Sequence, residues 1–169
     1  LVVSVVGLGG DGGVYRTANA YDPTPTFTRS LTTGDGTSAG RTELAVNRSG
    51  AVVTIYAAAG TSNGTLYKSI EGGVTFNPAA GGAGFCNPQC FYDIAVAVDP
   101  VDSNKVYLGG SPALVFARSI NGRSTFTKSS ANLHVDTRAF AISPSSPNVV
   151  YFGSDGGVWR TNNVDATPI

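Results

Sequence analysis

Apolar and polar residues alternate with a period of two in short runs along the whole chain. Val53-Thr54-Ile55-Tyr56 is one such run, while Ile94-Ala95-Val96-Ala97-Val98 alternates small Ala with larger apolar residues. No segment of useful length shows the spacing of an amphipathic helix. Gly, Ser and Thr separate the runs, as expected for strands joined by tight turns. We expect strands over 2–8, 13–17 and 26–31, complete strand groups over 41–80 and 91–130, and a last group over 136–163 without an outer strand. The pattern therefore predicts an all-β chain.

The strand groups repeat one another. The motif Asp-Gly-Gly-Val-aromatic-Arg-Thr occurs at 11–17 and again at 155–161, and related strand pairs lie between these positions. Each strand pair closes on a hydroxyl residue, and Thr17, Ser69, Ser119 and Thr161 are 52, 50 and 42 residues apart. A repeat of about 40–50 residues with several strands per unit is typical of a β-propeller.

A turn follows each closing hydroxyl. The segments 69–76 (Ser-Ile-Glu-Gly-Gly-Val-Thr-Phe) and 119–126 (Ser-Ile-Asn-Gly-Arg-Ser-Thr-Phe) resemble the Asp box of sialidase-type (BNR) repeats, Ser-x-Asp-x-Gly-x-Thr-Trp or Phe. The third position differs from the family, with Glu71 and Asn121 in place of Asp. Glu71 is one methylene too long for the usual bond to the turn backbone. We assign a structural role in the repeat turns to Asp11, Glu71, Asn121 and Asp155.

The resemblance implies a sialidase/BNR-type β-propeller with about 3.5–4 four-stranded antiparallel blades. The expected organisation is a single partial propeller over 1–169, with approximate blades at 1–31, 32–80, 81–130 and 131–169. Propellers have 4–8 blades, so we expect missing blades from a seven- or eight-bladed parent. Pairing with a second chain and closure as a compact four-bladed ring are the alternatives.

Composition narrows the class of partner. The 11 basic and 11 acidic residues balance, and no basic cluster occurs, which argues against a nucleic-acid partner. No apolar run is long enough for a membrane span. Cys86 and Cys90 are too few for a zinc site beside a single His. We expect them to form a local disulfide, with free thiols as the alternative, and a disulfide implies a secreted or cell-surface protein.

The segment His134-Val135-Asp136-Thr137-Arg138 is the main candidate for a ligand-binding site. In an extended strand His134, Asp136 and Arg138 share one face, which predicts a ligand-binding row at the propeller channel. The alternative is a structural network between blades. The segment resembles a His-x-Asp-x-His element of secreted BNR proteins, with Arg138 in place of the last His, which weakens a metal site.

Other polar residues give weaker evidence for a binding site. Asp11 and Asp155 precede Gly-Gly and indicate hairpin turns. They fall short of the six to eight oxygen ligands of Ca2+, so Ca2+ lacks support and no metal or cofactor is expected. The recurring basic residues Arg16, Lys68, Arg118 and Arg160 predict a solvated strand face.

The sequence contains no nucleophile motif and no distinct carboxylate pair, so we assign no catalytic residue. BNR-like propellers include sialidases, xyloglucan-active hydrolases, sortilin-type receptors and assembly factors, and the fold does not choose among them. The first hypothesis is a non-catalytic secreted or cell-surface module that binds a protein or a glycan. The alternatives are a fragment of a glycoside hydrolase and a structural subunit of an extracellular assembly.

Overall fold

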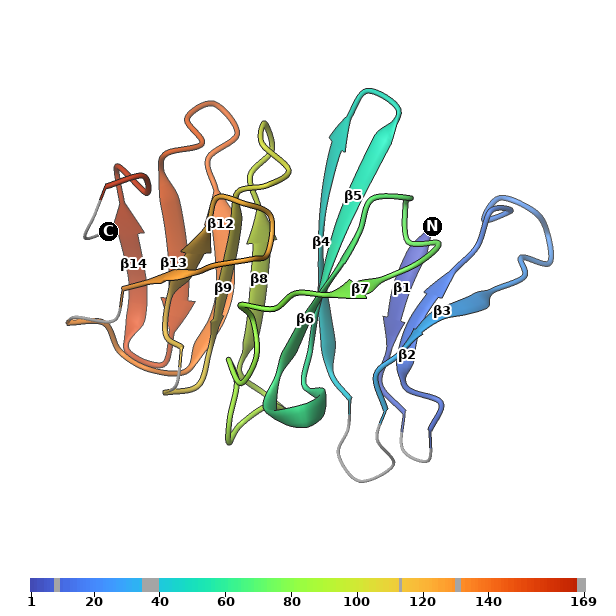
Figure 1. Ribbon diagram of the computed structural model, residues 1–169, viewed down its shortest axis with the longest axis horizontal. Helices are drawn as coiled ribbons and strands as arrows, with labels where there is room; N and C mark the ends of the chain where they lie inside the picture. The colour runs from blue at the N-terminus through green and yellow to red at the C-terminus, as the bar shows by residue number, and fades with distance from the viewer. Residues whose placement is uncertain (8–9, 35–39, 113, 130–131, 167–169) are drawn as a thin grey trace.

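The fold consists of four antiparallel sheets that stand side by side, as the computed structural model shows (Figure 1). The structure describes residues 1–7, 10–34, 40–112, 114–129 and 132–166. Within these ranges the only helical element is the 3-10 turn η1 (Thr61–Asn63). No helix in the described ranges has the length and apolar character needed to cross a bilayer.

Each sheet is a meander of consecutive strands. The first sheet holds β1 (Val2–Val5), β2 (Gly13–Arg16) and β3 (Thr28–Thr32). The second holds β4 (Thr42–Ser49), β5 (Val52–Ala59), β6 (Thr65–Ser69) and β7 (Asn77–Pro78). The third holds β8 (Ile94–Val98), β9 (Val106–Gly110), β10 (Ala117–Ser119) and β11 (Thr127–Lys128). The fourth holds β12 (Thr137–Ile142), β13 (Val150–Ser154) and β14 (Gly157–Thr161).

This arrangement confirms the predicted all-β fold of partial propeller type. The first strands of the second, third and fourth sheets, β4, β8 and β12, lie next to one another, and the later strands of each sheet lead away from them (Figure 1). The strand predicted over 2–8 ends at Val5, and Leu8 lies outside the described residues. The other expected strands form close to their predicted positions.

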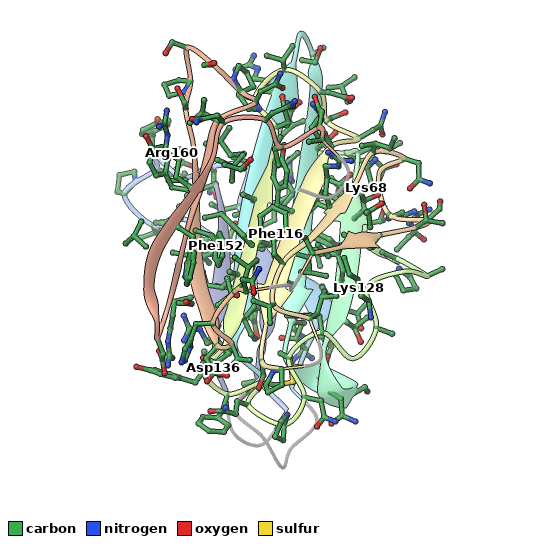
Figure 2. The ribbon with its side chains drawn as sticks, turned by 90° about the vertical axis from the view of Figure 1, so that its left-hand side faces the viewer. Lys68, Phe116, Lys128, Asp136, Phe152 and Arg160 are labelled. Atoms are coloured by element: carbon green, nitrogen blue, oxygen red, sulfur yellow. A yellow bond between two sulfur atoms is a disulfide. The ribbon has the colours of Figure 1, made fainter. Side chains whose placement is uncertain are left out.

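Apolar side chains between adjacent sheets form two cores. The larger core includes Tyr56, Leu66, Phe85, Ile94 and Leu108 and joins the second and third sheets. The smaller core joins the third and fourth sheets and is rich in aromatic rings. Its buried members are Tyr107, Phe116, Val150, Phe152 and Val164. Figure 2 shows Phe116 and Phe152 close together inside this layer. Face-to-face packing of blades, and not a central globular core, therefore holds the sheets together.

The turns after the third strands depend on the residue two positions after the closing hydroxyl. Asn121 Oδ1 accepts hydrogen bonds from the backbone N–H groups of Ser124 and Thr125, at 3.0 and 3.1 Å. The longer Glu71 side chain instead accepts a bond from the Thr75 hydroxyl, at 2.6 Å. In this turn Ser69 Oγ, and not the residue at position 71, accepts a hydrogen bond from the Gly73 backbone N–H. A carboxamide thus fits this turn more directly than the longer glutamate.

The recurring basic residues connect neighbouring sheets, so the prediction of a solvated face is wrong for three of the four. Arg16 Nε donates to the Gly72 carbonyl of the second sheet, and Arg118 Nη1 donates to the Val164 carbonyl in the fourth. Lys68 Nζ donates to Asn104 Oδ1 of the third sheet, at 3.1 Å. Only Arg160 is exposed, over the ring of Tyr151 in the last sheet.

Two tyrosines at matching positions provide a test of this blade contact. Tyr56 Oη lies 2.8 and 2.9 Å from the carbonyls of Ser103 and Gly122 in the third sheet. The Tyr107 hydroxyl is buried without a hydrogen-bond partner among the described residues. We expect Tyr56→Phe to lower the free energy of unfolding by about 1–2 kcal/mol, because buried carbonyls lose their donor. Tyr107→Phe should change it by less than about 0.5 kcal/mol. Urea denaturation measures both, and equal losses would contradict the assignment.

Candidate functional site

The candidate site lies at the end of the propeller where the inner strands begin. Tyr92 and Asp93 directly precede β8, Asp136 directly precedes β12, and Arg138 is the second residue of β12. Asp155 stands in the turn between β13 and β14. This end is the lower edge in Figure 1, and Asp136 is labelled there in Figure 2. We call these five residues the mouth cluster.

Arg138 is the centre of the mouth cluster. Its Nε and Nη2 atoms donate to Asp155 Oδ1 at 2.9 and 2.7 Å. Its Nη1 atom lies 2.9 Å from Asp93 Oδ1, an ion pair whose direction departs from that of a hydrogen bond. The guanidinium carbon lies 3.6 Å above the centre of the Tyr92 ring. One cation therefore joins a carboxylate from the third sheet, a carboxylate from the fourth sheet and an aromatic ring.

Asp93 is the most deeply placed acid of the mouth cluster, with no exposed side-chain surface. Burial raises the pKa of its carboxyl group, Arg138 opposes this rise, and the nearby Asp136 adds to it. Its Oδ2 atom has no hydrogen-bond partner in the described part of the chain. A carboxyl group in this position braces the two sheets and cannot touch a ligand in solution.

The structure separates the three residues of the predicted row. β12 begins only at Thr137, and Asp136 has a φ of 68°, so His134, Asp136 and Arg138 do not follow one extended strand. Asp136 accepts bonds from Gln89 Nε2 at 3.2 Å and Ser111 Oγ at 3.5 Å. His134 is exposed, and its Nδ1 atom lies 3.0 Å from the neighbouring Val135 carbonyl. Asp136 and Arg138 belong to the mouth cluster, whereas His134 stands outside its contacts.

A disulfide loop completes the site. Cys86 and Cys90 are bonded, as predicted, and Cys86 is fully buried in the larger core. The Gln89 carbonyl accepts bonds from the N–H groups of Tyr92 and Asp93, which ties the loop to the start of β8. Phe91 and Tyr92 stay 63% and 50% exposed at the rim. The loop therefore leads into two exposed aromatic residues, of which Tyr92 packs against the Arg138 guanidinium that bonds Asp155.

Sequence reasoning gave Tyr92 no role in a site and counted Asp93 only among the available carboxylates. The available signal was the alignment of 92–100 with 136–144, which places both residues ahead of an inner strand, as Asp136 is. Their role was hidden because the partner of Asp93 is Arg138, 45 positions away in the next sheet.

The Asp-Gly turns form the expected hairpins. Ser154 pairs with Gly157 around Asp155, and Val5 pairs with Gly13 in the hairpin that contains Asp11. The Asp155 carboxylate also accepts a hydrogen bond from Arg138, so this residue contributes to the mouth cluster in addition to its predicted role in the turn. In the described ranges, no group of three or more His, Cys, Asp or Glu side chains is arranged to hold a metal ion.

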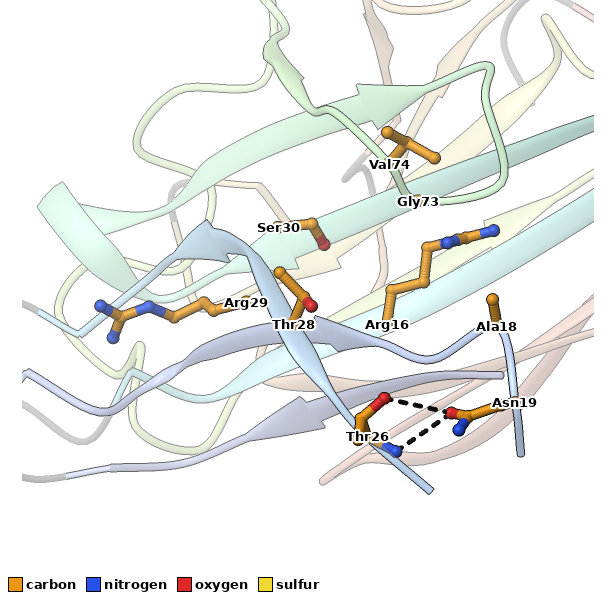
Figure 3. A pocket seen from close by; sticks show the side chains of 9 residues that line it. All are labelled: Arg16, Ala18, Asn19, Thr26, Thr28, Arg29, Ser30, Gly73 and Val74. Carbon is orange, nitrogen blue, oxygen red and sulfur yellow. Dashed lines mark hydrogen bonds between the residues drawn. The ribbon is translucent and has the colours of Figure 1, made fainter. Parts of the chain in front are cut away.

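A polar cavity of about 350 Å³ lies between the first and second sheets (Figure 3). It is lined by Arg16, Asn19, Thr26, Thr28 and Arg29, among others. Figure 3 shows the side chains of Arg16 and Arg29 pointing in different directions. Arg16 donates to the Gly72 carbonyl, and Arg29 donates to the Gly10 carbonyl. The Asn19 side chain is bonded to Thr26. The cavity therefore lacks the converging guanidinium groups of a carboxylate-binding site.

Comparison with known proteins supports the fold. No protein-family model and no curated protein matches the sequence. A GH74 enzyme from Niastella koreensis superimposes with a TM-score of 0.68 and 18% identity, over 95% of this chain and 30% of the enzyme. An ancestral GH74 enzyme gives a TM-score of 0.57 and 18% identity, over 96% of this chain and 22% of that enzyme. The chain thus spans less than a third of either enzyme, and at this identity the likeness concerns the fold.

Proposed function

We propose that this chain is part of a secreted or cell-surface β-propeller that binds a glycan at the mouth cluster without cleaving it. The observation that carries the proposal is the exposed Tyr92, whose ring packs on the Arg138 guanidinium that bonds Asp155, with the exposed Phe91 next to it in the chain. The C–H face of a sugar ring packs on aromatic rings, while its hydroxyl groups bond carboxylates and amides. The disulfide loop and Arg138 fix this surface in advance, which lowers the entropic cost of binding.

The arrangement favours binding over catalysis. Glycoside hydrolysis needs two carboxyl groups that both reach the scissile bond. Asp93 has the raised pKa that suits a general acid, but it is fully buried and paired with Arg138. Asp136 and Asp155 are both engaged with protein groups. The acids therefore act in this proposal as a brace and as hydrogen-bond acceptors.

A glycoside hydrolase fragment is the second candidate. The closeness of the carboxyl groups of Asp93 and Asp136, together with the structural likeness to GH74 enzymes, favours it. In this candidate further acids would come from chain regions outside the present sequence. Both candidates include a larger ring of seven or eight blades, to which this chain contributes the blades 1–31, 32–80, 81–130 and 131–169. The exposed Arg160 and Tyr151, whose counterparts contact a neighbouring sheet, support such a ring.

Removal of one aromatic ring tests the binding proposal. We expect Phe91→Ala to weaken binding of a soluble neutral polysaccharide at least about tenfold, because a solvent-exposed platform is lost. Affinity electrophoresis with xyloglucan and mixed-linkage β-glucan as probes measures the change. Ile70→Ala is the matched control, since Ile70 is also 63% exposed but lies after β6 at the other end of the strands.

Three outcomes would count against this proposal. Equal retardation of Phe91→Ala and the parent protein would show that the Phe91 ring does not contribute to glycan binding. Absence of retardation with every polysaccharide would exclude these glycans and favour a protein ligand. Release of reducing ends that is lost in Asp136→Asn would favour the hydrolase candidate instead.

A further inference from the structure

One position in the turns after the third strands changes its charge from sheet to sheet. Counted from the closing hydroxyl as the first residue, the fifth residues in the second, third and fourth sheets are Gly73, Arg123 and Asp165. The carbonyl just before this position accepts a hydrogen bond from the preceding sheet in each case, donated by Arg16, Tyr56 and Arg118 in turn. The fifth residue therefore lies where two neighbouring sheets meet.

Between the third and fourth sheets this position carries a carboxylate that balances two cations. Asp165 Oδ2 lies 3.0 Å from Lys105 Nζ, and its Oδ1 atom lies 3.5 Å from Arg118 Nη1. Between the second and third sheets, Lys68 takes the place of Arg118, and Arg123 takes the place of Asp165. Within the described ranges neither Lys68 nor Arg123 forms an ion pair. One contact between sheets thus has its anion, and the other has a second cation instead.

The two unbalanced cations share a cavity of about 240 Å³, which Glu71 and Asn77 also help to line. The Lys68 ammonium lies directly against the turn that carries Arg123, because a Cβ atom added at Gly122 would be 2.6 Å from Lys68 Nζ. Burial and the charge of Arg123 lower the pKa of Lys68, and Asp102 opposes this change. The cavity is smaller than the usual pocket for a drug-sized molecule. Its size suits a ligand of about one sugar residue.

The backbone at Arg123 is a second indication of a site. Arg123 has a φ of 151°, and Gly73 at the equivalent position has a φ of 84°. The Asp-box pattern also has Gly here, as expected where φ is positive. The turn is held in place, since the Arg123 carbonyl accepts a hydrogen bond from the Gly81 N–H at 3.2 Å. A side chain in a conformation that favours glycine is typical of ligand sites.

We propose that the cavity between Lys68 and Arg123 binds a small hydroxy acid of the uronic-acid class. The carboxylate of the ligand pairs with the Lys68 ammonium and the Arg123 guanidinium, as Asp165 pairs with two cations in the next contact between sheets. Hydroxyl groups of the ligand donate to the carboxylate of Glu71, which lines the same cavity.

This cavity is separate from the mouth cluster. It adjoins the turns that follow β6 and β10, whereas the mouth cluster lies where the inner strands begin. Figure 2 shows Lys68 in the upper half of the molecule and Asp136 near its lower end. The inference therefore does not depend on what the mouth cluster binds.

Titration with sodium galacturonate tests the proposal. In ¹H–¹⁵N correlation spectra of the labelled chain, we expect saturable shifts at the backbone amides of Glu71, Gly122 and Arg123. Galactose lacks the carboxylate and acetate lacks the hydroxyl groups, so each should bind at least about tenfold more weakly. Absence of saturable shifts with galacturonate, or equal affinity for galactose, would overturn the proposal. Equal affinity for acetate would overturn the role of Glu71 and the assignment to a hydroxy acid.

Substitutions locate the site. Arg123→Gly removes one cation and places glycine where φ is positive. It should weaken galacturonate binding at least about tenfold without lowering the melting temperature. Lys68→Gln should also weaken binding. Arg48→Gln is the matched control, because it removes the same charge from an exposed side chain that bonds the nearby Gly50 carbonyl. This control should bind galacturonate as the parent protein does.

Two results would contradict the role given to Arg123. If Arg48→Gln weakened binding as much as Arg123→Gly does, the attraction would come from the overall charge of the chain and not from this cavity. If Arg123→Gly lowered the melting temperature and left the affinity for galacturonate unchanged, Arg123 would serve the fold alone. Either result would overturn the proposal.

Discussion

Replacement of Arg138 by methionine is expected to lower the free energy of unfolding by about 3 kcal/mol at pH 7. The variant keeps an unbranched side chain against Tyr92 but leaves the fully buried Asp93 carboxylate without its cation. An unpaired buried charge costs several times more than a surface ion pair. Urea denaturation monitored by tryptophan fluorescence measures the loss, since Trp159 lies in the last sheet.

The loss should depend on pH in a defined direction. The pKa of Asp93 in the folded protein is raised above its unfolded value of 3.8. A raised carboxyl pKa contributes stability that is complete below pH 3.8 and is lost as pH rises through the folded pKa. Without Arg138 the folded pKa rises further, so the variant loses more stability between acidic and neutral pH. The difference between Arg138→Met and the parent should therefore be largest at pH 7 and smallest near pH 4.

Two further variants separate this effect from general damage. Arg160→Met removes an exposed guanidinium that also lies over a tyrosine ring, and it should change stability by less than about 0.5 kcal/mol. The double variant Asp93→Asn/Arg138→Met removes the buried charge together with its partner and should recover part of the loss. A loss that is the same at pH 4 and pH 7, or that Asp93→Asn leaves unchanged, contradicts the role given to this pair.

Phe116→Ala is expected to destabilise the protein by about 4 kcal/mol. Phe116 is 2% exposed, and its ring centre lies 5.6 Å from those of both Phe140 and Phe152 in the fourth sheet. Truncation leaves a cavity between the third and fourth sheets, where aromatic contacts hold the two together. Hydrogen exchange should show faster opening of β12–β14 than of β4–β6, because only the former depend on this layer.

The control for this change is Val158→Ala, which truncates a side chain of the same last sheet that is 79% exposed. Its effect should stay below about 0.5 kcal/mol. Uniform acceleration of exchange in all four sheets would show instead that the blades unfold as one cooperative unit.

The accuracy of the sequence-based predictions followed the range of the interactions involved. The turn at Asn121 and the disulfide between Cys86 and Cys90 connect residues at most four positions apart, and both formed as predicted. The row from His134 to Arg138 did not form, because Asp136 takes a positive φ just before β12. The basic residues were predicted as solvated, but Arg118 is 7% exposed because it donates to a carbonyl 46 positions away.

Alternation of apolar residues, glycine-rich turns and the repeated closing hydroxyl were enough to determine an all-β chain of propeller blades. Each of these signals acts within one strand or one turn, where side-chain direction follows from the backbone alone. Only the tertiary structure decided which charges are buried and which polar side chains join neighbouring sheets. Desolvation and ion pairing at Asp93 depend on Arg138 in the next sheet, and Arg118 donates to the Val164 carbonyl in the fourth sheet. Both are set by how the blades pack, since a residue's environment there comes from segments about one repeat away in the chain.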